Sequence, residues 1–274
     1  MSLQLDGPLL VAGAGRMGGA MLAGLIARGL APAQIIVQDP APPPDVAAFL
    51  ARHGIAATPT VAALPTPPSV ILAAVKPQVM DAVFPALARL AGPDTLTLSI
   101  AAGRTIASFA AHLPGGAAIM RAMPNTPAAI GKGITVCCAN AATTPAQRAL
   151  GETLLSAIGE VAFIADESQM NAVTALSGSG PAYVFHLVEA MAAAGVAAGL
   201  DAGLAQRLAR STVAGSGALL EASAEDAATL RRNVTSPGGT TAAALDVLMA
   251  TPGLTDLITE AILAAKRRGE VLAQ

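Results

Sequence analysis

The residues with the clearest chemical potential are three glycines near the N-terminus. Gly13, Gly15 and Gly18 follow the apolar run Leu9–Ala12 in the spacing G-x-G-x-x-G. Where such a run is a buried strand and the glycines open a helix, backbone N–H groups and the helix N-terminus face a pyrophosphate. The spacing alone is a weak signal in a chain with 27 glycines. Its place between a strand-like and a helix-like segment favours a dinucleotide site.

A carboxylate stands where such a site would contact the ribose. The next strand-like run, Gln34–Gln38, is followed by Asp39 and Pro40, with no arginine beside them. An acid at this place suits the free 2′-hydroxyl of NADH and repels the 2′-phosphate of NADPH. This residue therefore predicts that NADH is at least competitive with NADPH as cofactor.

Two glycine- and serine-rich breaks offer a second kind of chemistry. They are SGSGP at 177–181 and TSPGGTT at 235–241, and each precedes a helix-like stretch. A helix start combines free N–H groups with the positive end of the helix dipole, and the hydroxyls of these turns add further donors. A carboxylate would fit such a turn. The alternative is that both are ordinary helix–helix turns.

The elements that must position these residues show a different sequence pattern in each half of the chain. Up to residue 164, strand-like runs alternate with alanine-rich helical segments, which is typical of a parallel sheet covered on both faces. Ligands of such sheets bind at the carboxyl ends of the strands. The strand candidates are Leu9–Ala12, Ile35–Gln38, Ser69–Val75, Thr95–Ile100, Ala118–Ala122, Ile134–Cys138 and Glu160–Ile164.

From residue 165 onward, helical patterns replace the strands. We expect helices over Glu167–Leu176, Pro181–Gly199, Ala202–Ala222, Glu225–Val234, Thr240–Ala250 and Leu254–Ala273, with Asp166, Asp201 and Thr255 as N-caps. The predicted fold is α/β: a Rossmann-type parallel sheet over 1–164 and an all-helical domain over 165–274. Between Glu167 and Leu200 the only further formal charge is Glu189, so these helices should pack against a second subunit.

Composition excludes several partners. A net charge of −2 and an aromatic content of 2% do not favour nucleic acid. The mean hydropathy of +0.59 raises the question of a membrane, yet no window of about twenty residues reads as a spanning helix and no secretory signal is recognisable. The three histidines and the adjacent Cys137 and Cys138 lack the spacing of a metal site. We expect a cytoplasmic, metal-free protein whose two cysteines are small buried residues.

Five separated motifs are similar to one family. They are the glycine turn at 12–18, AVKPQ at 74–78, RAMPNTPA at 121–128, TALSGSGPAY at 174–183 and NVTSPGGTT at 233–241. Together they closely resemble Δ1-pyrroline-5-carboxylate reductases, from about Leu9 to the C-terminus. The resemblance implies a Rossmann domain, a helical dimerisation domain and often a ring of dimers. It also implies hydride transfer from NAD(P)H to the C=N carbon of 1-pyrroline-5-carboxylate, giving L-proline.

The same resemblance implies roles for particular residues. The Thr241 hydroxyl would bond the ring nitrogen, while Ser236 and the N–H groups of Gly239, Thr240 and Thr241 would hold the carboxylate. Helix capping is the other role open to Thr241. The implied cofactor-binding residues are Gly13, Ala14, Gly15, Arg16, Met17, Asp39, Ala74, Val75, Lys76, Pro77 and Asn233. The 123–127 loop would border the nicotinamide, and 177–180 would shape the pocket.

Two stretches depart from the family pattern, and two other functions are open alternatives. Asp226-Ala227-Ala228 and Arg231-Arg232 replace a usual His-Pro-Gly and Lys-Asp, which puts a substrate contact by Glu225 in doubt. A β-hydroxyacid dehydrogenase shares the two-domain plan but needs a catalytic lysine in the helical half, and no lysine lies between Lys132 and Lys266. A dinucleotide sensor or a pyridoxal-phosphate-handling module without turnover is the non-catalytic alternative, and an assay separates it from a reductase.

Overall fold

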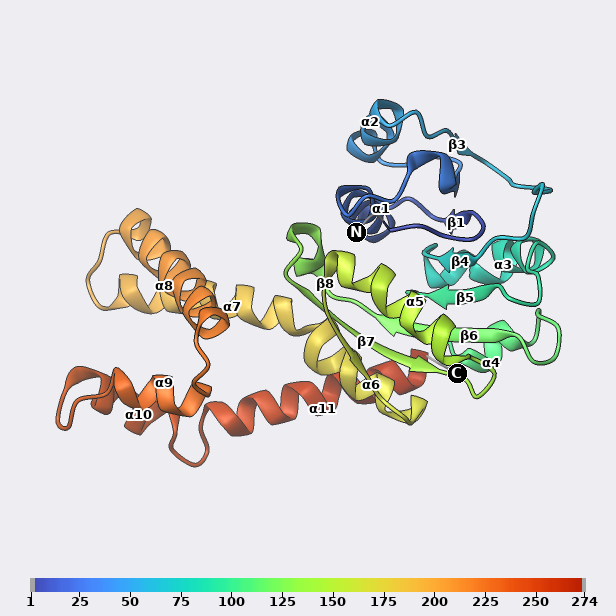
Figure 1. Ribbon diagram of the computed structural model, residues 1–274. Coiled ribbons are helices and arrows are strands. Elements are labelled where there is room, and N and C mark those ends of the chain that lie inside the picture. Colours follow the sequence, from blue (N-terminus) through green and yellow to red (C-terminus); the bar gives the residue numbers. More distant parts are fainter. Residues whose placement is uncertain (1–2, 273–274) are drawn as a thin grey trace. The chain divides into compact units, whose positions relative to one another are not determined.

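The structure is a computed structural model that describes residues 3–272 (Figure 1). Its contacts divide into two compact units. The first unit contains the residues through Gly178 together with those from Lys266 onward, and the second is Ser179–Ala265. The predicted domains, 1–164 and 165–274, begin and end in residues outside the described range, and their boundary stays a prediction.

The first unit is built on an eight-stranded sheet with the order β3-β2-β1-β4-β5-β6-β7-β8. Neighbouring strands run parallel except for β6 and β7, which are antiparallel. The fold class predicted for this half, a Rossmann-type sheet, is confirmed. The strands are β1 (Leu9–Ala12), β2 (Ile35–Gln38), β3 (Ala57–Thr58), β4 (Val70–Ala73), β5 (Leu96–Ser99), β6 (Ala118–Met123), β7 (Gly133–Ala139) and β8 (Gly159–Phe163).

Two details of the sheet differ from the sequence prediction. The two-residue strand β3 was not expected, because two residues are too few to show a period. Strand β7 runs antiparallel because only nine residues, 124–132, connect it to β6. A parallel return needs a crossover of about a dozen residues or more.

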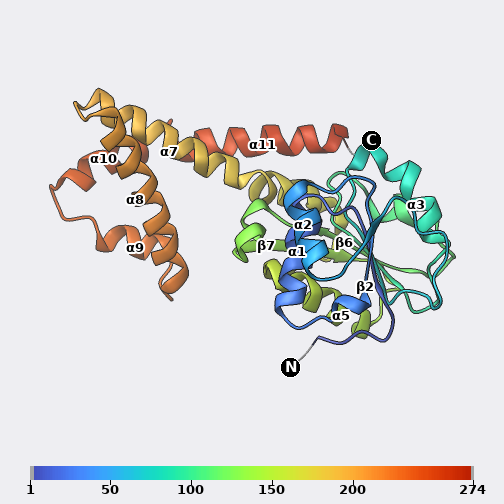
Figure 2. The same cartoon turned by 90° about the horizontal axis from the view of Figure 1, so that it is seen from above.

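Helices cover both faces of the sheet, as Figure 2 shows. One core lies between the sheet and α1 (Arg16–Ala27), α2 (Pro44–Arg52) and α5 (Pro145–Leu155). The other lies between the sheet and α3 (Met80–Ala88) and α4 (Ile106–Ala110). Strands β1 and β4 are fully buried, which explains their continuous apolar runs. Cys137 and Cys138 are free and buried, as expected, and burial raises the pKa of Cys137 to about 12.

The predicted helix over 167–176 is more complex than expected. A 3-10 turn at Glu167–Gln169 leads into the short helix α6 (Met170–Val173), and a π-helical turn follows at Thr174–Gly178. Asp166 caps this segment by accepting a hydrogen bond from the Ser168 N–H at 2.8 Å. The polar turn residues favour tight turns over a regular helix, and π-turns often occur at functional sites.

The second unit is helical, as predicted. It contains α7 (Gly180–Ala197), α8 (Ala202–Ala222), α9 (Ala227–Asn233), α10 (Thr240–Leu248) and the part of α11 (Leu254–Leu272) up to Ala265. Asp201 caps α8 through the Leu204 N–H, as expected. The expected cap Thr255 is wrong, because α11 begins at Leu254 and Thr255 is its second residue. The Asp256 carboxylate accepts a hydrogen bond from the Gly253 N–H at 2.8 Å. Ala273, the expected last helical residue, lies outside the described residues.

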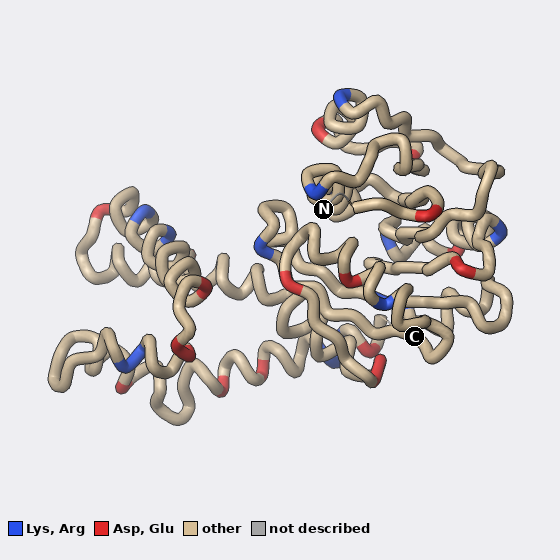
Figure 3. Tube along the Cα trace, in the orientation of Figure 1, with Lys and Arg blue, Asp and Glu red and all other residues tan. Residues whose placement is uncertain are grey.

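Large apolar side chains on the second unit are exposed. Phe185 on α7 and Val247 on α10 are 63% and 73% exposed. Charged residues are few on α7, as the long tan stretches of Figure 3 illustrate. Within residues 3–272, no helix combines the length and the apolar character that crossing a bilayer requires. Apolar surface of this kind marks an interaction face.

Candidate functional site: a dinucleotide turn and a helix-start turn

The glycine turn has the shape that a pyrophosphate site needs. Gly13 adopts a φ of +95°, and a Cβ there would lie 2.7 Å from backbone atoms of Ala74 and Val75. A Cβ on Gly18 would overlap the carbonyl oxygen of Gly13. At Gly15, by contrast, a Cβ would meet no described atom within 4 Å. Gly13 and Gly18 are therefore required by packing, whereas Gly15 borders open space at the N-terminus of α1.

The other residues of the turn differ in exposure. Ala14 is buried, Arg16 is exposed at the first residue of α1, and Met17 packs partly into the core. The free N–H groups of the first turn of α1 and the open space at Gly15 together fit a diphosphate. A nicotinamide dinucleotide would be held here, and its reduced ring supplies a hydride.

The Asp39 carboxylate is bound to the backbone of the same site. Its Oδ2 accepts a hydrogen bond from the Ala14 N–H at 2.7 Å, and its Oδ1 accepts one from the Ala41 N–H at 2.8 Å. The Gly13 N–H also donates to the Gln38 carbonyl at 2.9 Å. The ends of β1 and β2 are thus joined, and Asp39 lies beside the glycine turn as its sequence position predicts.

The segment after β4 runs beside the same turn. The Ala74 N–H donates to the Ala12 carbonyl at 2.8 Å, which extends the parallel ladder of β1 and β4. Val75 packs partly against the core, whereas Lys76 is exposed. Pro77 then opens a 3-10 turn ahead of α3. Of the predicted cofactor residues, those from Gly13 to Pro77 therefore lie at the carboxyl ends of β1, β2 and β4.

A cavity of about 600 Å³ adjoins this edge of the sheet. Pro77 and the 102–105 loop after β5 line it, and Asn171, Thr174 and the end of α11 complete it. Arg104 forms a bidentate ion pair with Asp81, while its buried Nε finds no partner among the described residues. A buried donor without a partner fits a ligand acceptor at this place. The sequence pointed to the 101–103 strand end and included Thr174 in a family motif, but it assigned no site role to Arg104, Asn171 or Thr174.

Two polar contacts hold the neighbouring loops. The Asn125 amide donates to the Ser177 carbonyl at 3.2 Å, and its oxygen accepts from the Ile134 N–H at 3.0 Å. The loop after β6 therefore lies against the π-turn, and the residues expected to border the nicotinamide and to shape the pocket are adjacent. Arg121, with 6% of its side chain exposed, pairs with Glu167 at 2.8 Å. Glu167 also accepts from the Ile106 N–H at 2.9 Å.

The second glycine-rich turn lies in the other unit, at the start of α10. The Gly239 N–H donates to the Ser236 carbonyl at 3.1 Å, so this amide is used within the turn. Gly239 is the N-cap of α10, which makes Thr240 and Thr241 its first two residues. Thr241 is therefore not the helix cap. Its hydroxyl makes no hydrogen bond within residues 3–272, and the N–H groups of Thr240 and Thr241 belong to the open first turn.

Asn233 is bound to Glu225, the residue whose contact with the substrate was in doubt from the sequence. Its amide donates to the Glu225 Oε2 at 3.1 Å, which ties the end of α9 back to the residue that precedes its cap. Asp226 caps α9 by accepting from the Thr229 N–H, and this hydrogen bond lowers the pKa of Asp226. A hollow of about 350 Å³ beside Thr235 is lined by Arg231 and Arg232.

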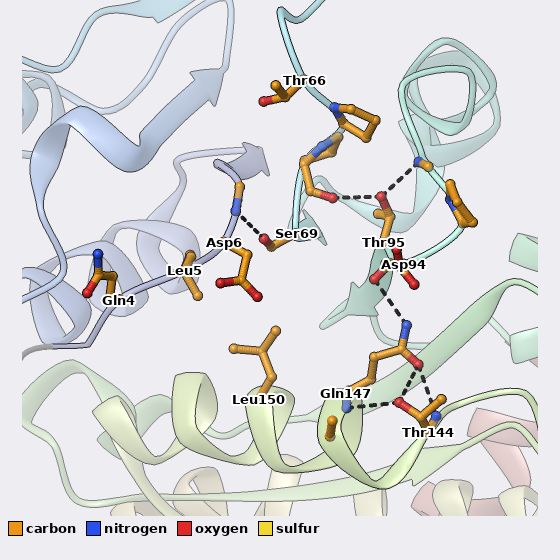
Figure 4. A pocket seen from close by; sticks show the side chains of 16 residues that line it. Gln4, Leu5, Asp6, Thr66, Ser69, Asp94, Thr95, Thr144, Gln147 and Leu150 are labelled. Carbon is orange, nitrogen blue, oxygen red and sulfur yellow. Dashed lines mark hydrogen bonds between the residues drawn. The ribbon is translucent and has the colours of Figure 1, made fainter.

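A cavity at the opposite edge of the sheet is no candidate. It measures about 610 Å³ and lies at the amino ends of β1, β4 and β5, beside the start of α5 (Figure 4). Several of its polar groups are paired with one another: the Ser69 Oγ accepts from the Gly7 N–H, and the Thr95 hydroxyl donates to the Pro68 carbonyl. Ligands of such sheets bind at the carboxyl edge. None of the predicted site residues lines this cavity.

Known proteins share both halves of this architecture. Residues 9–103 match the family model described as NADP oxidoreductase, coenzyme F420-dependent, and residues 167–272 match pyrroline-5-carboxylate reductase dimerisation. A pyrroline-5-carboxylate reductase of Pseudomonas aeruginosa is 40% identical over 262 residues, covering 96% of this chain and 95% of that protein. The chain belongs to the pyrroline-5-carboxylate reductase family.

Other members of the pyrroline-5-carboxylate reductase family show the same likeness. The Escherichia coli reductase is 38% identical, with 96% of this chain and 97% of that protein covered. The solved structure of a Coxiella burnetii reductase is 32% identical and superposes with a TM-score of 0.89 over 98% of this chain and all of that chain. A Plasmodium falciparum reductase solved with NADP bound is 26% identical, with a TM-score of 0.76 over 98% of this chain and 99% of that chain. The chain is an oxidoreductase that uses NAD(P)H, with a dimerisation domain.

Proposed function

We propose that this chain reduces 1-pyrroline-5-carboxylate to L-proline, with Thr241 as the catalytic residue of the helical unit. The observation that carries the residue assignment is the start of α10, where the two open amides of Thr240 and Thr241 and a hydroxyl without a described partner stand together. Family membership supports the reaction class.

The reaction asks mainly for binding and orientation. A cyclic imine is basic enough to be partly protonated near neutrality, and its iminium form is already an electrophile. Amides at a helix start stabilise a carboxylate through hydrogen bonds and the helix dipole. We assign the substrate carboxylate to the Thr240 and Thr241 amides with Ser236, and the ring nitrogen to the Thr241 hydroxyl. Gly239 shapes the turn, because its amide is bound to Ser236.

The cofactor assignment rests on the first unit. Gly13, Ala14, Gly15, Arg16 and Met17 would surround the diphosphate, with Asp39 at the ribose, and Ala74, Val75, Lys76 and Pro77 would follow the dinucleotide. In the second unit, Asn233 completes the cofactor set. Its bond to Glu225 gives both residues a defined geometry. We therefore propose that Glu225 orients Asn233 and does not contact the substrate itself.

The assembly and location belong to the same proposal. The exposed apolar residues of α7, α8 and α10 support a homodimer through the helical domain, with a ring of dimers as the larger assembly. Two buried free thiols support a cytoplasmic location, where thiols stay reduced. In the full sequence no lysine stands between Lys132 and Lys266, so nothing favours a lysine-dependent β-hydroxyacid dehydrogenase.

One assay tests the proposed reaction. Purified protein is mixed with racemic pyrroline-5-carboxylate and NADH or NADPH, and the loss of reduced-nicotinamide absorbance is compared with the proline formed. We expect one proline for each cofactor oxidised. Dinucleotide binding without proline formation would identify the chain as a non-catalytic sensor.

A further inference from the structure

The ribose end of the dinucleotide site carries a fixed negative charge. Both oxygens of Asp39 are bound by backbone amides, Oδ2 by Ala14 at 2.7 Å and Oδ1 by Ala41 at 2.8 Å. One amide belongs to the glycine turn and the other to the segment that follows β2. With both oxygens bound by backbone amides, the carboxylate is held beside the glycine turn.

The acceptor capacity of this carboxylate matches a hydroxyl. An ionised carboxylate offers about four lone-pair sites, two on each oxygen. The two amides use one site on each oxygen, so one remains on each for a ligand. A ribose 2′-hydroxyl can donate a hydrogen bond to such a site. A 2′-phosphate is an acceptor that carries about −1.5 to −2 charges at neutral pH, so it meets a charge of the same sign.

Within residues 3–272, no lysine or arginine forms an ion pair with Asp39 that would offset that repulsion, and the exposed Lys76 follows the neighbouring strand β4. Between Gly29 and Val75, the stretch that forms β2, α2, β3 and β4, the only lysine or arginine is Arg52. Arg52 lies in the last turn of α2, at the opposite end of that helix from the Asp39 loop, and it packs 6.0 Å above the Phe49 ring. Arg16 is the exposed first residue of α1, where its charge would act on the diphosphate that both cofactors share.

We propose that Asp39 makes this enzyme prefer NADH to NADPH, and that the same carboxylate positions the glycine turn. This inference deepens the proposed function, because it names which of the two dinucleotides the site selects. Loss of the charge then has two separate effects. It removes the discrimination against a 2′-phosphate, and it weakens binding of both dinucleotides because the Ala14 amide loses its acceptor.

The test uses ligands that contain neither nicotinamide nor substrate. Calorimetry measures the binding of ADP-ribose and of 2′-phospho-ADP-ribose to the full chain as wild type, Asp39→Ser and Asp45→Asn. Asp45 is an exposed acid in the first turn of α2, so its replacement removes one charge without touching the turn. We expect wild type and Asp45→Asn to bind ADP-ribose at least about tenfold more tightly than they bind 2′-phospho-ADP-ribose.

In Asp39→Ser, we expect the ratio of the two affinities to fall to about one, with ADP-ribose itself bound less tightly than by wild type. The wild-type preference should also shrink as salt is raised from low to physiological strength, since screening weakens repulsion between charges. Tighter binding of 2′-phospho-ADP-ribose by wild type, or an Asp39→Ser ratio equal to that of wild type, would overturn the proposal. Because neither probe is a substrate, these outcomes do not depend on whether the chain reduces pyrroline-5-carboxylate.

Discussion

At the scale of single residues, the three glycines of the first turn do different work. Gly13 and Gly18 meet other backbone atoms, so any side chain there disturbs the junction of β1, α1 and the segment after β4. Gly15 meets open space, and its φ of −70° is available to any residue. The sequence spacing could not separate these roles, because all three glycines look alike in a motif.

We therefore predict opposite results for two substitutions. Gly15→Ala should fold with unchanged or slightly raised stability, while dinucleotide affinity falls about tenfold or more because the methyl group occupies the diphosphate space. Gly18→Ala should lower the free energy of unfolding by about 3 kcal/mol, since its methyl group overlaps the Gly13 carbonyl. Urea unfolding and calorimetric titration with ADP-ribose measure the two effects. Equal loss of stability in both variants would contradict this assignment.

A second residue-scale prediction concerns Thr241. Thr241→Ala should lower kcat about tenfold, equivalent to about 1.4 kcal/mol, because a hydrogen bond to the ring nitrogen is lost, while the dinucleotide Kd stays nearly constant. Thr255→Ala is the matched control, since Thr255 is also the second residue of its helix, α11. Steady-state kinetics and cofactor titration on both variants decide the matter. A kcat of Thr241→Ala equal to that of wild type would exclude a catalytic role for this hydroxyl.

At the scale of elements, one ion pair connects β6 to the 3-10 turn that precedes α6. Arg121 and Glu167 are 46 positions apart in the sequence, and Glu167 also accepts the first amide of α4. Arg121 is buried, whereas Glu167 keeps 28% of its side chain exposed. The two partners should therefore respond differently to loss of the other, because only Glu167 can regain contact with water.

We predict that Glu167→Gln costs more stability than Arg121→Met. The first leaves a buried guanidinium without its countercharge and should cost about 3 kcal/mol, whereas the second replaces the guanidinium with an apolar side chain of similar length. The exposed pair Lys266–Glu270, at 3.5 Å on α11, is the control, and Glu270→Gln should cost about 0.5 kcal/mol or less. Urea midpoints of the three variants provide the comparison. The reverse order of Glu167→Gln and Arg121→Met would show that the pair is not desolvated in solution.

At the scale of the whole molecule, the helical unit leaves many large apolar side chains exposed to solvent in the single chain. Exposed leucine side chains occur on α7, α8, α10 and α11, and α7 adds Phe185 and Met191. The match to a dimerisation domain over 167–272 explains why these apolar side chains are exposed in a single chain. Burial of apolar surface between two copies is worth about 25 cal/mol per Å², which favours association through this domain.

We predict that the wild-type chain sediments as a dimer or a larger assembly of dimers. Phe185→Asp, which puts a charge on the exposed face of α7, should shift it toward the monomer, because a buried unpaired carboxylate is costly. Ala62→Asp, in an exposed loop of the sheet unit, is the control and should leave the sedimentation coefficient unchanged. Analytical ultracentrifugation over a range of concentrations gives the answer. A monomeric wild type would refute the assembly proposed here.

Local signals determined much of this protein from the sequence alone. Apolar runs bounded by glycine and proline placed β1 and β2 at their observed residues, and Asp201 was found as a cap, because strand burial and capping depend on neighbours a few residues away. The glycine spacing likewise located the turn between β1 and α1. These features follow from short-range sterics and hydrogen bonding, which a single sequence displays.

Only the tertiary structure decided which distant groups pair. It joined Asp39 to the Ala14 amide, Arg121 to Glu167 and Asn125 to Ser177, across 25, 46 and 52 positions. It also turned β7 antiparallel and made Gly239 the cap of α10, in place of Thr241. No period or spacing encodes such pairs, because they depend on how strand ends and loops meet once the sheet has formed.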